Sequence, residues 1–286
     1  MPADSRADSV MRAMTDDGAF RVVAARMTDT VNRALTAQGA WGNNGRYLGE
    51  LLTGAVLVRE TMAPTHRVQS LFHTRDRRGQ LVADAHPDGG TRGLLMRKQG
   101  LSEISLDGGT LEMMRTLYTG EVHRGVVRIP DHGGLSQALM TYMASSEQVA
   151  SMIAVACVLD GEAVQAAGGY IVQLLPEVGR GPLAIMTERL RDFEQIDGLL
   201  TEIDAAPAPL LSELLHGMPF TQLDKSALRF QCRCSTVRVM SALASIGREQ
   251  LVELLRDERP IEMECDYCGQ QFAVQPVELQ GLLDRS

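Results

Sequence analysis

The sequence predicts an α+β protein in three parts: an N-terminal α/β core domain with mostly antiparallel strands, a helical linker, and a small C-terminal four-cysteine zinc domain. Three observations support this prediction. Strand-like apolar runs are joined by short hairpin turns rather than alternating regularly with helices. A stretch rich in glycine and proline, 177–182, then marks a change of composition. Beyond it, four of the five cysteines stand in two close pairs.

Residues 1–176 are expected to form the core domain. The polar stretch 1–17 is expected to be a loose start. Strands are predicted where β-branched and aromatic residues gather, and helices where apolar residues recur three or four positions apart. The predicted strands are 19–28, 66–74, 80–86, a hairpin over 110–129 around Gly120, 152–159 and 163–176. The predicted helices are 29–38, 45–62 and 133–148. Glycines in 88–90 and 107–109 are interpreted as hairpin or loop residues.

Residues 177–227 are expected to be a helical linker without a core of its own. The linker opens with EVGRGP (177–182), whose glycines and proline are typical of a connecting segment. A helix follows, DAAPAPLL (204–211) interrupts it, and a short second helix is possible over 210–217. Apolar residues recur along the first helix at helical spacing; they are Leu190, Phe193, Ile196, Leu199, Leu200 and Ile203.

Residues 228–286 are expected to form the C-terminal domain. The predicted helices are 235–247, which Ser235 would cap and Gly247 would end, and 248–258. Two short strands are predicted within 261–274, joined by the Cys265–Cys268 turn, before a terminal helical turn.

The two cysteine pairs predict one Zn²⁺ per chain, held by Cys232, Cys234, Cys265 and Cys268. Zinc prefers four ligands in a tetrahedron, and thiolate sulfur suits it. Cys265 and Cys268 are two residues apart in a turn, and Gly269 lets the backbone fold tightly there. Cys232 and Cys234 supply two more ligands if the chain turns before Ser235. A unit of this size buries little surface, so zinc binding, worth on the order of 10 kcal/mol, would exceed its intrinsic stability of about 5 kcal/mol.

The residues leave three functions for such a site open. An inert zinc site would belong to a structural interaction protein. The C-x-x-C spacing is also that of thiol–disulfide oxidoreductases, in which Cys265 and Cys268 would turn over substrates. Alternatively, two close pairs can be oxidised to two local disulfides, which would eject the metal together with its folding free energy. Oxidation would then be an unfolding switch.

Composition excludes several other classes. The net charge is −8, and acidic residues outnumber arginines after residue 228, which argues against binding to nucleic acid or to anionic membranes. The N-terminus lacks the apolar region of a secretory signal, and no apolar run is long enough to span a membrane. A cytoplasmic location is expected, where thiols stay reduced. No phosphate-binding G-x-x-x-x-G-K-[ST] loop occurs. Cys157, in an apolar run, is expected to be a buried core thiol.

Several stretches resemble the redox-regulated heat-shock chaperone family of zinc-binding holdases, whose members are often called thirty-three-kilodalton chaperonins. The resemblance covers about residues 20–280, and its most specific part is the combination of both cysteine pairs with the AAGG segment. One departure is STVRVMSA (235–242), which stands where the family often has an arginine-rich segment. The matching stretches are YTGEVHRGVV (118–127), YMASSEQV (142–149), AAGGYIVQLLPE (166–177), FQCRCS (230–235) and ECDYCG (264–269).

The resemblance implies a non-enzymatic, ATP-independent holdase that is inactive while reduced and zinc-bound. Oxidative stress with mild heat would join Cys232 to Cys234 and Cys265 to Cys268, release zinc, unfold the C-terminal domain and loosen the linker. The chaperone would then form a homodimer and bind unfolding client proteins. Freed apolar surface binds other apolar surface. The candidate client contacts are Leu190, Phe193, Ile196, Leu199 and Leu200; a face permanently packed on the core is the alternative for each.

Overall fold

The structure is a computed structural model, and it describes residues 6–175, 180–256 and 259–284. The chain divides into two compact units, the first ending at Gln231 and the second beginning at Cys232. The sequence predicted a boundary four residues earlier, at 227/228. The later boundary follows from pairing, because Arg229–Phe230 form a short strand with the first unit. The predicted boundary at 176/177 lies outside the described residues.

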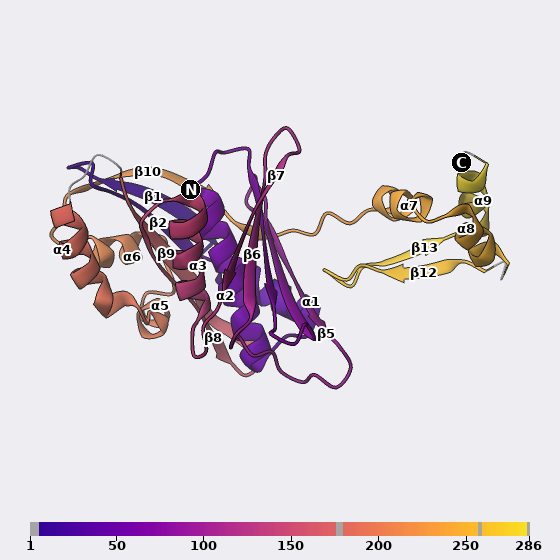
Figure 1. The fold of residues 1–286 in the computed structure, drawn as a ribbon, viewed down its shortest axis with the longest axis horizontal. Coiled ribbons are helices and arrows are strands. Elements are labelled where there is room, and N and C mark those ends of the chain that lie inside the picture. Colours follow the sequence, from indigo (N-terminus) through magenta and orange to yellow (C-terminus); the bar gives the residue numbers. More distant parts are fainter. Residues whose placement is uncertain (1–5, 176–179, 257–258, 285–286) are drawn as a thin grey trace. The chain divides into compact units, whose positions relative to one another are not determined.

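Two sheets form the first unit (Figure 1). Sheet A has five antiparallel strands, and sheet B has six strands that are antiparallel except for its first pair. The strands of sheet A are, in spatial order, β10 (Phe220–Ala227), β1 (Ser9–Thr15), β2 (Phe20–Arg26), β9 (Ala163–Leu174) and β8 (Ser151–Asp160). The strands of sheet B are β11 (Arg229–Phe230), β5 (Gly90–Arg97), β4 (Gly79–Ala85), β3 (Arg67–His73), β6 (Thr110–Thr116) and β7 (Val122–Arg128).

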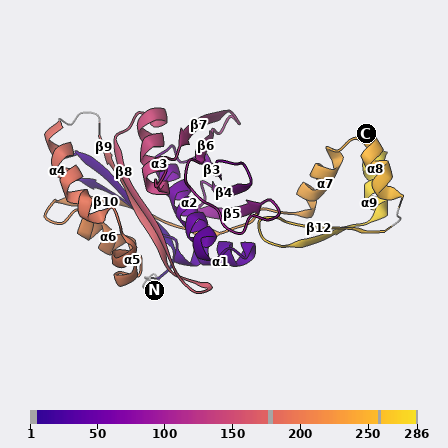
Figure 2. The same cartoon turned by 60° about the horizontal axis from the view of Figure 1, so that its bottom comes forward.

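The main core lies between the two sheets. Helix α2 (Gly42–Glu60) runs through it, with α1 (Thr28–Gln38) and α3 (Leu135–Tyr142) beside it (Figure 2). Leu48, Leu51 and Leu52 on α2 are fully buried, as expected for a helix that is enclosed by protein. After α3, residues 143–147 form a single π-helical turn. The antiparallel α+β core predicted from the sequence is therefore confirmed.

A second core covers the opposite face of sheet A, and it corrects the linker prediction. Helices α4 (Arg180–Leu190), α5 (Asp197–Glu202) and α6 (Pro207–Leu214) pack there against Phe20 and Tyr170. The Tyr170 hydroxyl donates a hydrogen bond to the Phe193 carbonyl at 3.1 Å. The described part of 177–227 thus belongs to the first unit and shares its core, and its last residues form strand β10 rather than helix.

One further prediction was wrong, and one strand was not predicted. Residues 9–15, within the predicted loose start, form β1, which is paired on both sides with β2 and β10. The sequence patterns predict no element between the glycines at 88–90 and residue 110, yet residues 90–97 form β5. Backbone pairing with β4 and burial of Leu94 fix this strand.

The second unit has a small core of its own. It contains α7 (Thr236–Ala244), α8 (Arg248–Leu255), the hairpin strands β12 (Ile261–Glu264) and β13 (Gln271–Val274), and α9 (Pro276–Leu283). Ser235 caps α7 as predicted, accepting a hydrogen bond from the Arg238 backbone at 3.3 Å. Gly247 stands at the start of α8 instead of ending α7. The side chains buried among the described residues are Leu243, Leu251, Val274, Leu279 and Leu283.

Within the ranges described, no helix combines the length and the apolar composition needed to cross a bilayer.

In the AAGG segment, Gly168 is required because strands β2 and β9 lie too close together there for a β-carbon. Gly168 lies on β9 opposite Arg26 of β2. A β-carbon at this position would stand 2.5 Å from the Ala25 carbonyl oxygen, a distance that only movement of the backbone could relieve.

We therefore expect Gly168→Ala to lower the free energy of unfolding of the first unit by about 1–3 kcal/mol, the usual cost of overpacking. Gly198→Ala is the matched control, because a β-carbon on Gly198 would have no atom within 4 Å and alanine favours a helix. Denaturant unfolding followed by circular dichroism measures both. Equal stability of the two variants would contradict this account of the segment.

Candidate metal centre

Four cysteines meet at one point in the second unit. The sulfur atoms of Cys232, Cys234, Cys265 and Cys268 all lie within 4.8 Å of one another. The Cys232 and Cys265 sulfurs are 3.6 Å apart, and those of Cys234 and Cys268 are 3.5 Å apart. The structure thus brings together all four cysteines that the sequence singled out.

The hairpin turn between β12 and β13 positions Cys265 and Cys268. The backbone N–H groups of Cys268 and Gly269 both donate to the Cys265 carbonyl, at 3.2 and 2.8 Å, and Cys265 N–H donates to the Gln270 carbonyl at 3.0 Å. Gly269 adopts φ +70°, a left-handed conformation that glycine accommodates without strain. The turn therefore directs two thiols to the same side.

The other two thiols come from the start of the second unit. Cys232 directly follows the boundary, and Cys234 is separated from α7 by the capping residue Ser235 alone. The Cys234 thiol lies 3.4 Å from the Gln270 side-chain oxygen, to which it donates. The chain therefore turns sharply enough between Cys232 and Ser235 for both sulfurs to reach the turn at Cys265–Cys268.

The spacing of the four sulfurs fits a tetrahedral metal ion. Zinc–sulfur bonds of about 2.3 Å in a tetrahedron place sulfurs about 3.8 Å apart, close to the two measured separations. A disulfide requires about 2.05 Å, so these cysteines are in the reduced form. The four residues can hold a metal ion, and their all-sulfur donor set suits a soft or borderline cation.

The electrostatics of the cluster favour a bound cation. Burial, together with hydrogen bonds to the neighbouring thiols, raises the pKa of Cys234 above its ordinary value, and burial raises the pKa of Cys268. Neighbouring thiolates repel one another, so a cluster of uncompensated thiolates is electrostatically unfavourable. A divalent cation among them removes that penalty and makes the thiolates its ligands.

Cys157 lies apart from this cluster, as predicted for a core thiol. It is 1% exposed on β8, and burial raises its pKa to about 12. Helix α2 packs so closely over it that a β-carbon on Gly49 would stand 2.5 Å from the Cys157 sulfur. A thiol in this setting is neither ionised nor accessible.

The linker residues predicted as candidate client contacts lie on α4, on α5 and in the segment between these two helices. Leu190, Ile196 and Leu200 are buried against sheet A, and Phe193 and Leu199 are partly buried beside them. In this reduced form of the chain, their apolar face is therefore covered.

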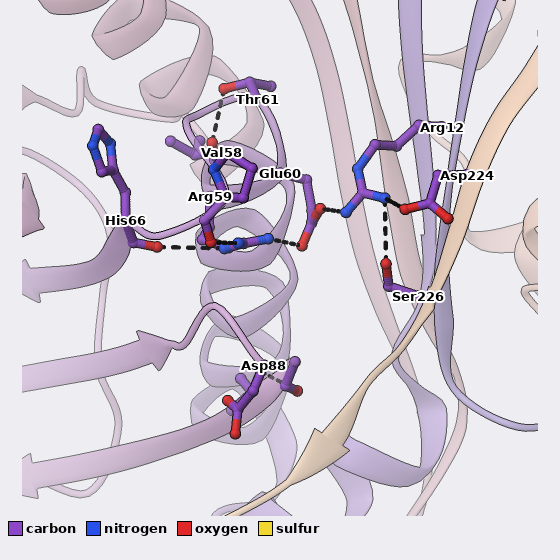
Figure 3. A network of polar contacts seen from close by, with 12 residues as sticks. Arg12, Val58, Arg59, Glu60, Thr61, His66, Asp88, Asp224 and Ser226 are labelled. Atoms are coloured by element: carbon purple, nitrogen blue, oxygen red, sulfur yellow. Dashed lines mark hydrogen bonds and ion pairs between the residues drawn. The ribbon is translucent and has the colours of Figure 1, made fainter. Parts of the chain in front are cut away.

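A polar network that the sequence did not reveal joins α2 to β1 and β10 (Figure 3). The buried Glu60 carboxylate pairs with Arg59 at 2.6 Å and with Arg12, and Arg12 also pairs with Asp224 at 2.8 Å. Arg21 donates to the Glu60 backbone carbonyl at 2.9 Å. These residues border a cleft of about 600 Å³. Sequence spacing carries no signal for them, because Arg12 and Asp224 are 212 residues apart.

Comparison with known proteins identifies related chains. The family model described as "Hsp33 protein" matches residues 8–275. The 33 kDa chaperonin of Bacillus subtilis is 27% identical over 291 residues, covering 98% of this chain and 99% of that protein. The 33 kDa chaperonin of Thermus thermophilus is 29% identical over 296 residues, covering 96% and 86%. The crystal structure of the 33 kDa chaperonin of Thermotoga maritima superposes with a TM-score of 0.84 at 21% identity, covering 97% and 98% of the two chains, and shows the same fold.

If the four sulfurs share one ion, replacing one should weaken binding sharply. Four ligands together contribute about 10–16 kcal/mol for zinc, so Cys232→Ser should reduce affinity by at least about 100-fold and destabilise the second unit. Cys157→Ala is the matched control for loss of a thiol. Metal titration of the reduced protein with a competing chelator measures both affinities. Unchanged tight binding by Cys232→Ser would contradict the four-ligand assignment.

Proposed function

Because this chain belongs to the Hsp33 family, we propose that it is a redox-switched, ATP-independent holdase controlled by its four-cysteine cluster. Membership of this chaperone family gives the chain a chaperone function, which implies binding of client proteins. The observation that carries the switch is the meeting of the four sulfurs within 4.8 Å. This proximity supports a switch, because oxidation of these thiols would remove the ligands that link the first residues of the second unit to its hairpin turn.

In the reduced state, Cys232, Cys234, Cys265 and Cys268 would hold one Zn²⁺ as thiolates. The ion supplies the positive charge that stabilises four adjacent thiolates and joins the start of the unit to its hairpin. Because the apolar core described for this unit is small, burial alone contributes little stability, and a metal crosslink would add to it. The second unit therefore depends on its thiolates remaining reduced.

Oxidation would convert the ligands into disulfides. One thiolate of a pair attacks a peroxide oxygen and becomes a sulfenic acid, while the other oxygen leaves as hydroxide; the second thiolate then displaces the hydroxyl group. Per disulfide, two thiolates, one peroxide and two protons give one S–S bond and two waters. A disulfide sulfur is a poor ligand, so the four residues release the ion.

We assign the disulfides to sequence neighbours, Cys232 with Cys234 and Cys265 with Cys268. In the folded unit, short sulfur separations also run between the pairs, 3.6 Å from Cys232 to Cys265 and 3.5 Å from Cys234 to Cys268. Those contacts depend on the fold, however, and it loosens as ligands are lost. Neighbours one or two residues apart remain close in an unfolded chain because their loop closure costs little entropy.

Unfolding of the second unit would then activate the chaperone. The candidate client contacts, Leu190, Phe193, Ile196, Leu199 and Leu200, belong to an apolar face that is covered in the reduced chain. Uncovering such a face lets it bind the apolar segments of unfolding proteins. We also propose that the active chain is a homodimer and acts in the cytoplasm under oxidative stress.

A thiol–disulfide oxidoreductase is the alternative that the C-x-x-C spacing raises. Such enzymes activate their thiol at a helix N-terminus. Here Cys265 and Cys268 occupy a turn between two strands, with two further thiols 3.5 and 3.6 Å away. This arrangement favours metal binding over substrate turnover.

The proposal predicts that metal release and activation occur together. Treating the reduced protein with peroxide at mildly elevated temperature should release about one Zn²⁺ per chain and switch on suppression of the aggregation of an unfolding client. A metal-sensitive dye and light scattering follow both in one sample. Cys157→Ala should behave like the parent chain. Complete metal release without any suppression would rule out the holdase.

The pairing is tested separately by mapping disulfides. After peroxide treatment and alkylation, proteolysis and mass spectrometry should recover Cys232 linked to Cys234 and Cys265 linked to Cys268. Recovery of Cys232–Cys265 and Cys234–Cys268 links would show instead that oxidation traps the folded contacts.

A further inference from the structure

One extended segment closes the edges of both sheets of the first unit. We call residues 220–230, which comprise β10, Leu228 and β11, the strap. Its first part pairs antiparallel with β1, from Thr15 opposite Phe220 to Ser9 opposite Ala227. Its last two residues pair parallel with β5. Without the strap, β1 would be the edge strand of sheet A.

The β10 part of the strap contributes few buried side chains. None of the residues in Phe220–Ala227 is buried, and Leu223 is 51% exposed. The neighbouring strand β1 is mostly buried. Phe220 is partly buried against the second core, and the other apolar anchors of the strap, Leu228 and the partly buried Phe230, lie at its opposite end. The edge of β1 therefore holds its occupant mainly through the main chain, which makes the position tolerant of the occupant's sequence.

The ion pair between Arg12 of β1 and Asp224 of β10 is positioned by a buried carboxylate, Glu60. Arg12 on β1 stands opposite Asp224 and pairs with its carboxylate at 2.8 Å. Asp224 is 64% exposed, whereas Arg12 is 15% and Glu60 3% exposed. Glu60, itself paired with Arg59, fixes the Arg12 guanidinium from the core side (Figure 3). If the strap were removed, Arg12 would stay paired with Glu60, and the side of its guanidinium that pairs with Asp224 could bind another carboxylate.

The strap is also continuous with the cysteine cluster. Gln231 N–H donates to the Thr91 carbonyl of β5 at 2.9 Å, and the next residue is Cys232. Gln231 alone therefore separates the strap from Cys232, the first of the four cysteines. Loss of order at the cluster therefore begins directly at the end of the strap.

We propose that the outer edge of β1, Ser9–Thr15, is a client-binding site that the strap occupies in the reduced chain. After release of the strap, an extended segment of an unfolding protein adds antiparallel to β1 through main-chain hydrogen bonds. A segment with Asp or Glu opposite Arg12 binds best, since that carboxylate takes the place of Asp224. This inference rests on the proposed holdase function and specifies how clients are recognised.

A crosslink between β1 and the strap tests the site. Met14 and Thr221 face each other in the β1–β10 register, and both are exposed. Met14→Cys with Thr221→Cys can be joined in the reduced, metal-loaded chain by oxidised glutathione. Met14→Ser with Thr221→Cys is the control that cannot form the bond. After peroxide treatment, both should release their metal, but the crosslinked chain should lose at least about tenfold in aggregation suppression.

The outcomes separate the two proposals. Equal suppression by the crosslinked chain and its control would overturn the β1 site and leave the holdase intact. A control that releases its metal without suppressing aggregation would overturn the holdase and, with it, this inference.

Hydrogen exchange measures directly whether the β1 edge is uncovered and then occupied. In the oxidised control, Ser9–Thr15 should lose protection and regain it when client is added, while β9 stays protected. Amides of β1 that stay unprotected with client bound would also overturn the site.

A peptide with the sequence of Phe220–Ala227 tests the carboxylate preference. It should compete with client for the oxidised full-length chain. The same peptide carrying Asp224→Lys should compete about tenfold less well, whereas Gln222→Lys, which adds a positive charge without removing the carboxylate, should compete almost as well as the parent. Equal competition by both lysine peptides would overturn the role of Arg12.

Discussion

In the proposed function, the folding of the second unit depends on four sulfur atoms that lie within 4.8 Å of one another. Cys232 and Cys234 come from its first residues, and Cys265 and Cys268 come from a hairpin turn much later in the unit. Thiolates at such separations repel one another, and a bound cation would offset that repulsion. The same chemistry that makes them good ligands makes them oxidisable. Stability and redox sensitivity therefore reside in the same atoms.

The two units differ in how much they depend on that cluster. The first unit has two sheets, an enclosed helix and apolar cores on both faces of sheet A. The second has a small core around Leu243, Leu251 and Leu279. Removal of the metal should thus unfold the second unit and spare most of the first. The exception is the strap, because each of its two strands is the outermost strand of its sheet and Gln231 alone separates it from Cys232.

Sequence patterns predicted the elements whose signal is local. The regular apolar spacing of α2, the hairpin of β6 and β7, and the ligand spacing of the cysteines each specify their structure within a few residues. Strand β1 was missed although it pairs with the adjacent β2, because buried polar residues such as Ser9 and Thr15 leave its sequence without a regular apolar alternation. Strand β5 was missed because glycines precede it. Likewise, the spacing of Leu190, Ile196 and Leu200 predicted an apolar face, but only the fold shows that sheet A covers it.

The central claim is that a metal ion, independently of oxidation, holds the second unit folded. The most direct test is to remove the metal with a chelator under strictly anaerobic, reducing conditions and to follow hydrogen exchange along the chain. The account predicts that residues 232–256 and 259–284 lose protection in proportion to the metal removed, whereas β2, β9 and α2 remain protected. Persistent protection of the second unit in fully metal-free, reduced protein would contradict it.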